Sequence, residues 1–287
     1  MENTVVIRKR RRHKGLPPWA TTPTFVVGVV IVVITCFLAV FPQLVSTHDP
    51  IEINVANQFL APGKDGHIFG TDKFGRDIFS RVVWGTRIDL MIGVFATIVP
   101  LITGSLIGML TGYFGGIFDS LLMRVADILM AFPFTILIIA IITILGPGTE
   151  NIFIAIWTVG WVEYARLIRG EVLVLKNSEF IQAAQVAGFK TSRILLRHLL
   201  PNVISTAVVF AASDVVLNML LGASMSFLGL GVQPPTPEWG AILNEGRGYI
   251  TYAWWITLFP GLFMMIAGVG FSLIGDGLTD FLRTKGR

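Results

Sequence analysis

Long apolar runs constrain this chain more than any other feature of its sequence. Six of them alternate with polar stretches, at residues 25–45, 90–112, 121–145, 152–165, 203–221 and 254–274. A helix of roughly 20 apolar residues crosses the hydrocarbon core of a bilayer and satisfies its own backbone polar groups there. The run at 152–165 is the weakest because it is short and contains Glu163, so it needs residues 166–170 to complete a span. We expect an all-α membrane protein with six transmembrane helices.

Composition supports this class and excludes others. Hydrophobic residues make up 53% of the chain and charged residues only 14%, whereas a soluble domain usually has about a quarter charged residues. The net charge of +4 does not indicate nucleic acid, because the basic residues stand beside the apolar runs; we expect membrane lipid and no nucleic acid as partner. Cys36 is the single cysteine. The four histidines, His13, His48, His67 and His198, lie scattered outside the predicted spans, so we expect no metal site and no catalytic site.

The charge distribution predicts the topology. Of the 22 Lys and Arg residues, 15 lie in the N-terminal tail, between residues 166 and 197, or after the last span, and positive loops stay in the cytoplasm. Both termini are therefore predicted to be cytoplasmic. The expected parts are a basic tail at 1–24, a first transmembrane helix at 25–45, an extracytoplasmic loop at 46–88, a transmembrane domain at 89–280 with a cytoplasmic loop at 171–200, and a cytoplasmic tail at 281–287. The run at 25–45 is longer than the apolar core of a signal peptide.

Several residues within the spans suggest packing or a polar route. Gly104, Gly108 and Gly112 form a small-residue stripe that lets two helices approach closely. Arg124 and Asp127 are three residues apart, so they can pair on one helix face. Asp214 and Asn218 are four apart in the fifth run, where ionisable groups often mark a pathway. Asp214 either lines a polar substrate route or bonds to a neighbouring subunit.

The predicted loop at 46–88 contains a dense polar pattern. Asp72 and Asp77 are suitable helix caps, and Arg76 and Arg81 are available to pair with them. In a solvated loop such ion pairs contribute little.

A water-compatible segment, Glu179–Pro201, interrupts the apolar runs. Ser178 or Asn177 can cap a short helix, and Phe180, Ile181, Ala184 and Ala187 can form its apolar side. Gly188 can end that helix in the left-handed conformation, and Pro201 suits the first turn of the next span. The residues alone fit equally an amphipathic helix at the lipid interface and a helix that docks on another protein.

Three motifs resemble one family. Gln182-Ala183-Ala184, three residues, Gly188, nine residues and then His198-Leu-Leu-Pro201 is similar to the Glu-Ala-Ala loop of ABC importer permeases. The Arg197-His198 pair, the segment 67–87 and the Pro-rich string 226–246 resemble the dipeptide/oligopeptide/nickel branch of that family. Two positions depart from the family pattern, namely Gln182 in place of an acid and Gly222 where an acid is frequent.

This resemblance implies a type I ABC importer transmembrane domain in the cytoplasmic (inner) membrane that passes peptides. It implies a sister permease subunit, two ATP-binding subunits and an extracytoplasmic solute-binding protein as partners. The residues expected to couple this chain to the ATPases are Glu179, Gln182, Ala183, Ala184, Gly188, Arg197, His198 and Pro201.

The sequence contains no Walker-type phosphate loop. We therefore expect a transport subunit that is not itself an enzyme and binds no cofactor, with ATP and Mg²⁺ held by the partner ATPases. The alternative is an ion-coupled secondary transporter that acts without ATPases; Asp214 supports it weakly, and it leaves Glu179–Pro201 unexplained.

Overall fold

The structure, a computed structural model, describes residues 23–285, with side chains through residue 280. The basic stretch at 8–14 and the rest of the predicted N-terminal tail through residue 22 lie outside the described residues. All regular elements of the described part are helices, apart from isolated β-bridges joining Lys64 to His67 and Thr71 to Asp77. In chain order they are α1 (Pro23–Val40), α2 (Pro42–Val45), η2 (Val55–Asn57), α3 (Ile78–Phe114), α4 (Gly116–Met130), α5 (Phe134–Leu145), α6 (Thr149–Leu175), α7 (Glu179–Val186), α8 (Thr191–Arg193), η3 (Ile194–Leu199), α9 (Leu200–Phe227), α10 (Trp239–Gly246), η4 (Arg247–Tyr249) and α11 (Trp255–Lys285).

Four helical stretches of the described chain are long and apolar enough to cross a membrane. They are α1, α3, the continuous stretch Thr191–Phe227 and residues Trp255–Asp280 of α11. The pair α4 and α5 is a fifth if it counts as one span. α6 has 27 residues but is not among these stretches, because Glu163 and Arg166 interrupt its apolar sequence. By length and composition the structure supports four or five spans, and six stays a prediction.

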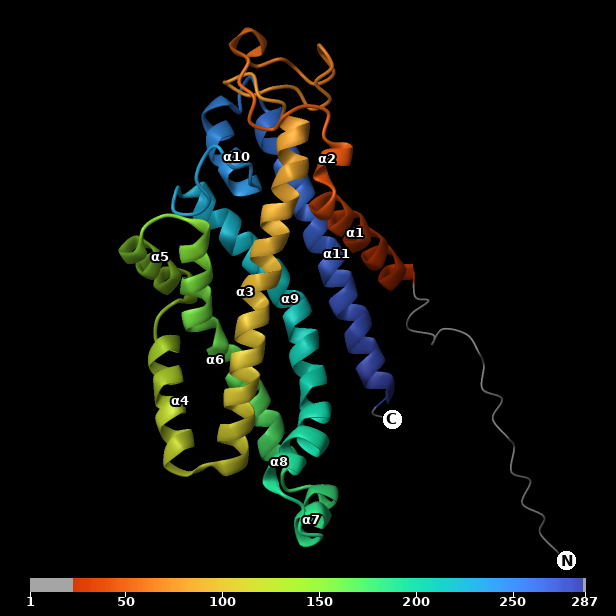
Figure 1. Cartoon of the computed structure of the whole chain (residues 1–287), viewed down its shortest axis with the longest axis vertical. Helices are drawn as coiled ribbons and strands as arrows, with labels where there is room; N and C mark the ends of the chain where they lie inside the picture. Colours follow the sequence, from red (N-terminus) through yellow and green to blue (C-terminus); the bar gives the residue numbers. More distant parts are fainter. Residues whose placement is uncertain (1–22, 286–287) are drawn as a thin grey trace, which may run out of the picture.

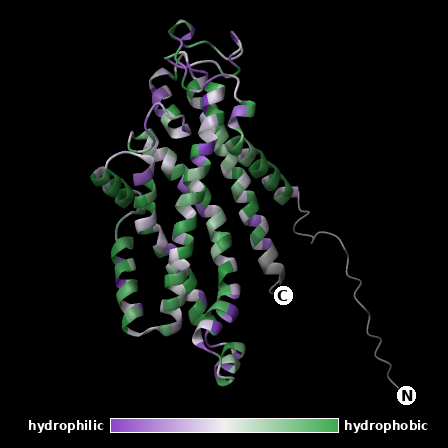
Figure 2. Cartoon of the chain, in the orientation of Figure 1, coloured by the Kyte–Doolittle hydropathy of each residue, from purple (hydrophilic) through white to green (hydrophobic). Residues whose placement is uncertain are grey.

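The helices form an elongated bundle whose two ends differ (Figure 1). The loop of residues 46–77 covers one end, together with α10, and we call this the loop end. At the opposite end α7 lies below the rest of the bundle, and we call this the α7 end. Apolar residues dominate the helices between the two ends, whereas polar residues gather in the loop and near α7 (Figure 2). This distribution is that of a protein embedded in a bilayer.

The second span begins earlier than the sequence predicts. α3 starts at Ile78 because the Asp77 carboxylate accepts a hydrogen bond from the Ser80 amide, which caps the helix. The predicted loop at 46–88 is therefore only 46–77. With 37 residues, α3 is about 55 Å long and extends well past a bilayer core of about 30 Å.

Two predicted runs are divided by proline. The run at 121–145 is bent by 88° between α4 and α5, and Pro133 stands just before α5. The run at 25–45 is interrupted at Phe41, which has a non-helical backbone and precedes Pro42. A residue before proline is disfavoured in the α conformation, so both runs divide where hydropathy alone shows no boundary.

The glycine stripe of α3 packs against α6, as expected of small residues. A Cβ atom on Gly104 would lie 2.4 Å from the Trp161 carbonyl oxygen, and one on Gly108 would lie 2.3 Å from the Ala165 carbonyl oxygen. Because backbone atoms cannot give way easily, only glycine permits this approach.

Gly222 has a packing explanation. A Cβ atom there would lie 2.5 Å from Cγ2 of Ile92 on α3. An acidic side chain at position 222 would collide with α3 in this packing. Glycine in place of the acid of the family pattern therefore permits close contact between α9 and α3.

Candidate functional site

The α7 segment forms the tip of the α7 end, where it connects α6 to the long stretch that contains α9 (Figure 1). α7 begins after Ser178, but the Ser178 side chain does not cap it. Its hydroxyl donates instead to the Leu175 carbonyl at 2.6 Å. The predicted side-chain cap is therefore wrong, because the last turn of α6 takes the hydroxyl as a donor.

Gly188 ends α7 as the sequence predicts. Its φ is +73°, and its amide donates to the Gln185 carbonyl while the Phe189 amide donates to the Ala184 carbonyl. These two bonds form a Schellman motif, in which a left-handed residue satisfies the last carbonyls of a helix. No atom lies within 4 Å of a Cβ built on Gly188, so the backbone conformation alone favours glycine.

α7 has one face turned inward and one turned outward. Ile181 and Ala184 are buried, with Ile181 fully inaccessible, and both belong to a core cluster with residues of α3, α6 and α9. Phe180 is 45% exposed and Val186 is 91% exposed, and Ala183 is exposed beside them. The predicted single apolar side is therefore divided. Its exposed half is an apolar surface on a helix only eight residues long.

The chain turns at residues 187–190 after α7 and then forms one continuous helical stretch from Thr191 through η3 into α9. η3 is a π-helical turn in which the Leu200 amide reaches back to the Leu195 carbonyl. This wider turn precedes Pro201 in the first turn of α9. Because proline has no amide hydrogen and crowds the preceding turn, a π-turn accommodates it without a break. Pro201 thus lies within an unbroken helical stretch.

His198 is half-buried in η3. Its ring stacks on Phe189 at 5.9 Å, and its Nε2 is buried without a hydrogen-bond partner among the described residues. The Arg193 guanidinium covers the same phenyl ring at 4.1 Å.

The other predicted coupling residues at this end are exposed, namely Glu179, Gln182 and Arg197. The Gln182 side-chain amide donates a hydrogen bond back to the Asn177 carbonyl.

A second candidate site lies between α3, α5, α6 and α9. The Asp214 carboxylate accepts a hydrogen bond from the Tyr164 hydroxyl at 2.7 Å, and Asn218 donates to the Thr97 hydroxyl at 2.9 Å. A cavity of about 210 Å³ is lined by Asp214, Asn218 and the exposed Glu163. The structure brings Asp214 and Asn218 together as the spacing predicts, and it adds Tyr164 as a partner from within the chain.

The predicted pairing of Arg124 with Asp127 is wrong. Asp127 pairs with Arg166 on α6, and Asp119 accepts two hydrogen bonds from Arg169 at 2.6 and 2.7 Å. Arg124 is exposed, and it has no ion pair within the described part of the chain. The acids of α4 therefore reach across to α6, which a helix-spacing rule does not reveal.

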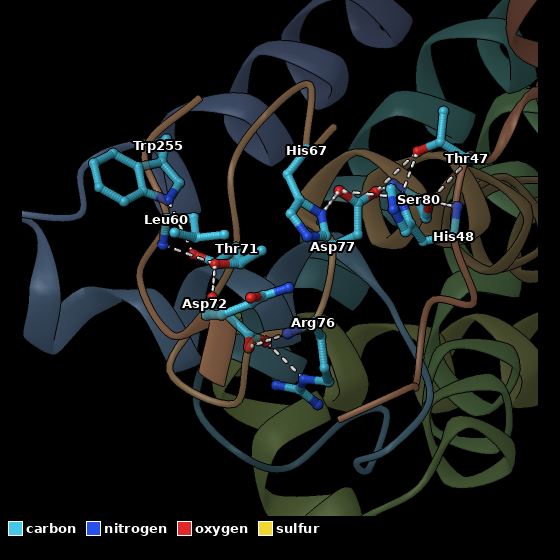
Figure 3. A network of polar contacts seen from close by, with 11 residues as sticks. Thr47, His48, Leu60, His67, Thr71, Asp72, Arg76, Asp77, Ser80 and Trp255 are labelled. Carbon is cyan, nitrogen blue, oxygen red and sulfur yellow. Dashed lines mark hydrogen bonds and ion pairs between the residues drawn. The ribbon is translucent and has the colours of Figure 1, made fainter. Parts of the chain in front are cut away.

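Several polar side chains at the loop end, some of which Figure 3 shows, are buried and not solvated. Asp72 accepts from Arg76 Nε at 2.6 Å and from Arg81 Nη1 at 2.7 Å, and these three side chains are at most 4% exposed. Glu245 lies 2.5 Å from Arg76 and 3.0 Å from Arg81. Both arginines thus share two acids, so the alternative of a solvated loop with weak ion pairs is wrong.

Two of the histidines are not scattered. The rings of His48 and His67 stack at 4.5 Å, and His67 Nδ1 lies 2.9 Å from the Asp77 carboxylate. Sequence reasoning missed this contact because 18 residues without regular periodicity separate the two histidines. The polar pattern around Asp77 was the only signal of an organised structure there.

Comparison with known proteins agrees with this architecture. Residues 104–285 match a family described as "Binding-protein-dependent transport system inner membrane component". The chain is 42% identical to the dipeptide transport system permease protein DppC of Alkalihalophilus pseudofirmus over 91% of its own length and 85% of the relative. It is 40% identical to the oligopeptide transport system permease protein OppC of Bacillus subtilis, over 90% of this chain and 85% of the relative. With the glutathione transport system permease protein GsiD of Pectobacterium atrosepticum it shares 43% identity, over 76% of this chain and 73% of the relative.

The chain belongs to this family of inner-membrane transport components. It is accordingly a multi-pass protein of the inner membrane, in agreement with its apolar helices.

Proposed function

We propose that this chain is a permease subunit of an ATP-driven ABC importer and forms half of a passage for peptides. The observation that carries the proposal is the similarity to a dipeptide permease along 91% of the chain. Relatives named for dipeptides, oligopeptides and glutathione all handle short peptides or peptide-like substrates. The common substrate class is therefore a short peptide backbone.

The proposed topology has six spans with both termini in the cytoplasm. It counts α1, α3, the bent pair α4–α5, α6, α9 and α11. The argument for α6 is that Arg166 and Arg169 have acidic partners on α4, which lowers the cost of charge near the membrane. This arrangement places the loop end outside and the α7 end in the cytoplasm, where the positive residues gather.

Coupling to the partner ATPases is proposed to use the exposed face of α7. Phe180, Ala183 and Val186 form a small apolar surface that a groove on an ATP-binding subunit would cover. A displacement of α7 would pass through η3 into α9 because Thr191–Phe227 is one continuous stretch. ATP shifts the equilibrium only through different affinities for the two states. ATP and Mg²⁺ are assigned to the partners, because this chain has no phosphate loop.

The remaining partners complete the assembly. A sister permease would supply the other half of the passage, and an extracytoplasmic solute-binding protein would deliver substrate to the loop end. The cavity beside Asp214 and Asn218 is our candidate for part of the passage wall, since a peptide in transit needs polar groups there.

The test is affinity purification of the tagged chain from its native membranes in mild detergent, followed by mass spectrometry. We expect a second permease and Walker-bearing ATPases. Ala183→Trp places a large ring on the exposed face of α7 and should abolish recovery of the ATPases while the sister permease is retained. Ala56→Trp, at an exposed alanine of the loop end, should recover both. Isolation of the chain alone, with transport that continues after ATP depletion, would contradict the proposal and favour the ion-coupled transporter.

A further inference from the structure

The loop end contains a cluster of metal-ligating groups that the proposed transport function does not use. His48 Nδ1, His67 Nδ1 and a carboxylate oxygen of Asp77 converge, and the ligand atoms of the three residues lie within 4.8 Å of one another. Figure 3 shows both imidazole rings beside the Asp77 carboxylate. From this arrangement we propose that His48, His67 and Asp77 form a binding site for one divalent transition-metal ion of the zinc type.

The distances suit such an ion. Metal–ligand bonds of 2.0–2.1 Å in tetrahedral geometry place neighbouring ligand atoms about 3.3 Å apart. The Asp77 oxygen is 2.9 Å from His67 Nδ1 and 3.8 Å from His48 Nδ1, so the two separations lie on either side of the required value. Rotation of the side chains would bring both separations to this value, with the ring protons on Nε2 so that each Nδ1 is free to bind the ion. Two imidazoles and one carboxylate select zinc-type ions over Mg²⁺ and Ca²⁺, which prefer oxygen ligands alone.

The second observation is the cavity on which the cluster opens. It has a volume of about 220 Å³, and its lining includes all three proposed ligands. Three further acids, Asp49, Glu52 and Asp65, line it, and no Lys or Arg does. Such a wall attracts cations, and it leaves room for water as the remaining ligand. The His48 side chain is 36% exposed, which gives an ion access from the cavity.

The surrounding hydrogen bonds hold the ligands in place. The second Asp77 oxygen accepts from the Ser80 amide at 2.7 Å, and the Ser80 hydroxyl accepts from the His48 amide at 2.9 Å. These bonds fix the backbone of His48 and the carboxylate of Asp77 on the first turn of α3. Outer partners of this kind orient metal ligands and raise affinity. A bound ion would therefore join residues 48 and 67 of the loop to the start of α3.

The test uses the full chain, purified with its co-purifying subunits through an affinity tag without histidine and stripped with a chelator. Zn²⁺ is titrated in competition with a fluorescent indicator. We expect one Zn²⁺ per chain, and at least about a hundredfold weaker binding in His67→Gln. Because His67 is buried, His48→Gln at the more exposed ligand is the second variant and should show a comparable loss.

Three controls sharpen this test. Glu150→Gln, at an exposed acid outside this cavity, and His198→Gln, at the α7 end, should bind Zn²⁺ within about threefold of the unmodified chain. Zn²⁺ should raise the unfolding temperature of the unmodified chain but not that of His48→Gln, and Mg²⁺ should raise neither. Equal binding in both ligand variants, or a wild-type Kd weaker than about 100 µM, would overturn the proposal.

Discussion

The Asp72 carboxylate accepts four hydrogen bonds at the loop end. It accepts hydrogen bonds from two buried arginines, and its other oxygen accepts from the amides of Phe74 and Arg76. A buried ion pair adds little over an apolar replacement, but removal of one partner leaves a charge without compensation. The stability of the folded loop end therefore depends strongly on the Asp72 carboxylate.

We expect Asp72→Asn to destabilise the folded chain by about 3–5 kcal/mol, because Arg76 and Arg81 would then share Glu245 alone. The measurement is the unfolding temperature of the purified assembly. Asp65→Asn is the matched control, since Asp65 is an exposed acid of the same loop, and it should leave the temperature nearly unchanged. Equal unfolding temperatures in the two variants would show that the buried ion pairs of Asp72 are not needed for the stability of the folded chain.

Gly188 is a second residue with a specific requirement. A β-branched residue at its φ of +73° costs about 1–2 kcal/mol or more, so Gly188→Val should move α7 and lower transport at normal expression. Gly170→Ala is the control, because Gly170 is a helical glycine with no atom within 4 Å of an added Cβ. Transport is measured as uptake of labelled peptide by cells. Full uptake by Gly188→Val would contradict a coupling role for this turn.

The buried carboxyl of Glu238 should make the stability of the folded chain depend on pH. It is fully buried beside Asp89, and burial raises the pKa of its carboxyl above 4.5. A raised pKa in the folded state favours the protonated form, so this contribution to stability is complete below 4.5 and is lost as pH rises through the folded-state pKa. The unfolding temperature of the unmodified chain relative to Glu238→Gln should therefore fall as pH rises. A difference independent of pH would refute this assignment.

At the scale of elements, α7 is held by its own chain on one face and left free on the other. Ile181 and Ala184 belong to the same cluster as residues of η3 and α9. This contact packs α7 against the stretch Thr191–Phe227. The proposed coupling through α7 depends on this packing.

The two faces of α7 should respond differently to the same substitution. Ala184→Trp overpacks the inward contact at a cost of about 1–3 kcal/mol, so trypsin should cleave after Lys190 or Arg193 several-fold faster than in the unmodified chain. Ala183→Trp projects from the exposed face and should leave the cleavage rate unchanged. Limited proteolysis of the purified assembly measures both, and equal rates in the two variants would contradict the division of faces.

At the scale of the whole molecule, the sequence predicted what depends on hydropathy and glycine. The helical class, the membrane setting and the close approach at Gly104 and Gly108 follow from patterns that each segment carries alone, whereas the inner membrane was implied by the family resemblance. The 88° bend at Pro133 was missed because hydropathy does not register backbone boundaries. Asp77 was predicted as a helix cap and is one, but the helix that it caps was not predicted to continue into the second span.

Contacts between residues far apart in the chain could not be predicted from the sequence. Asp127 pairs with Arg166 across two helices, and His48 meets His67 through an irregular loop. The Gly188 turn was predictable because it depends on one residue and its neighbours. The coupling role of the α7 segment depends on a partner chain, so it stays a prediction.

The central claim is that this chain passes peptides only when ATP acts on α7 through a partner. The most direct measurement is uptake of a labelled dipeptide into liposomes that contain the purified assembly and its solute-binding protein, with ATP supplied on the side of the ATPases. We predict uptake that requires ATP, is lost in Ala183→Trp and is retained in Gly170→Ala, which adds a methyl group where no atom lies within 4 Å. Uptake without ATP that follows an imposed ion gradient, and is equal in both variants, would contradict the account.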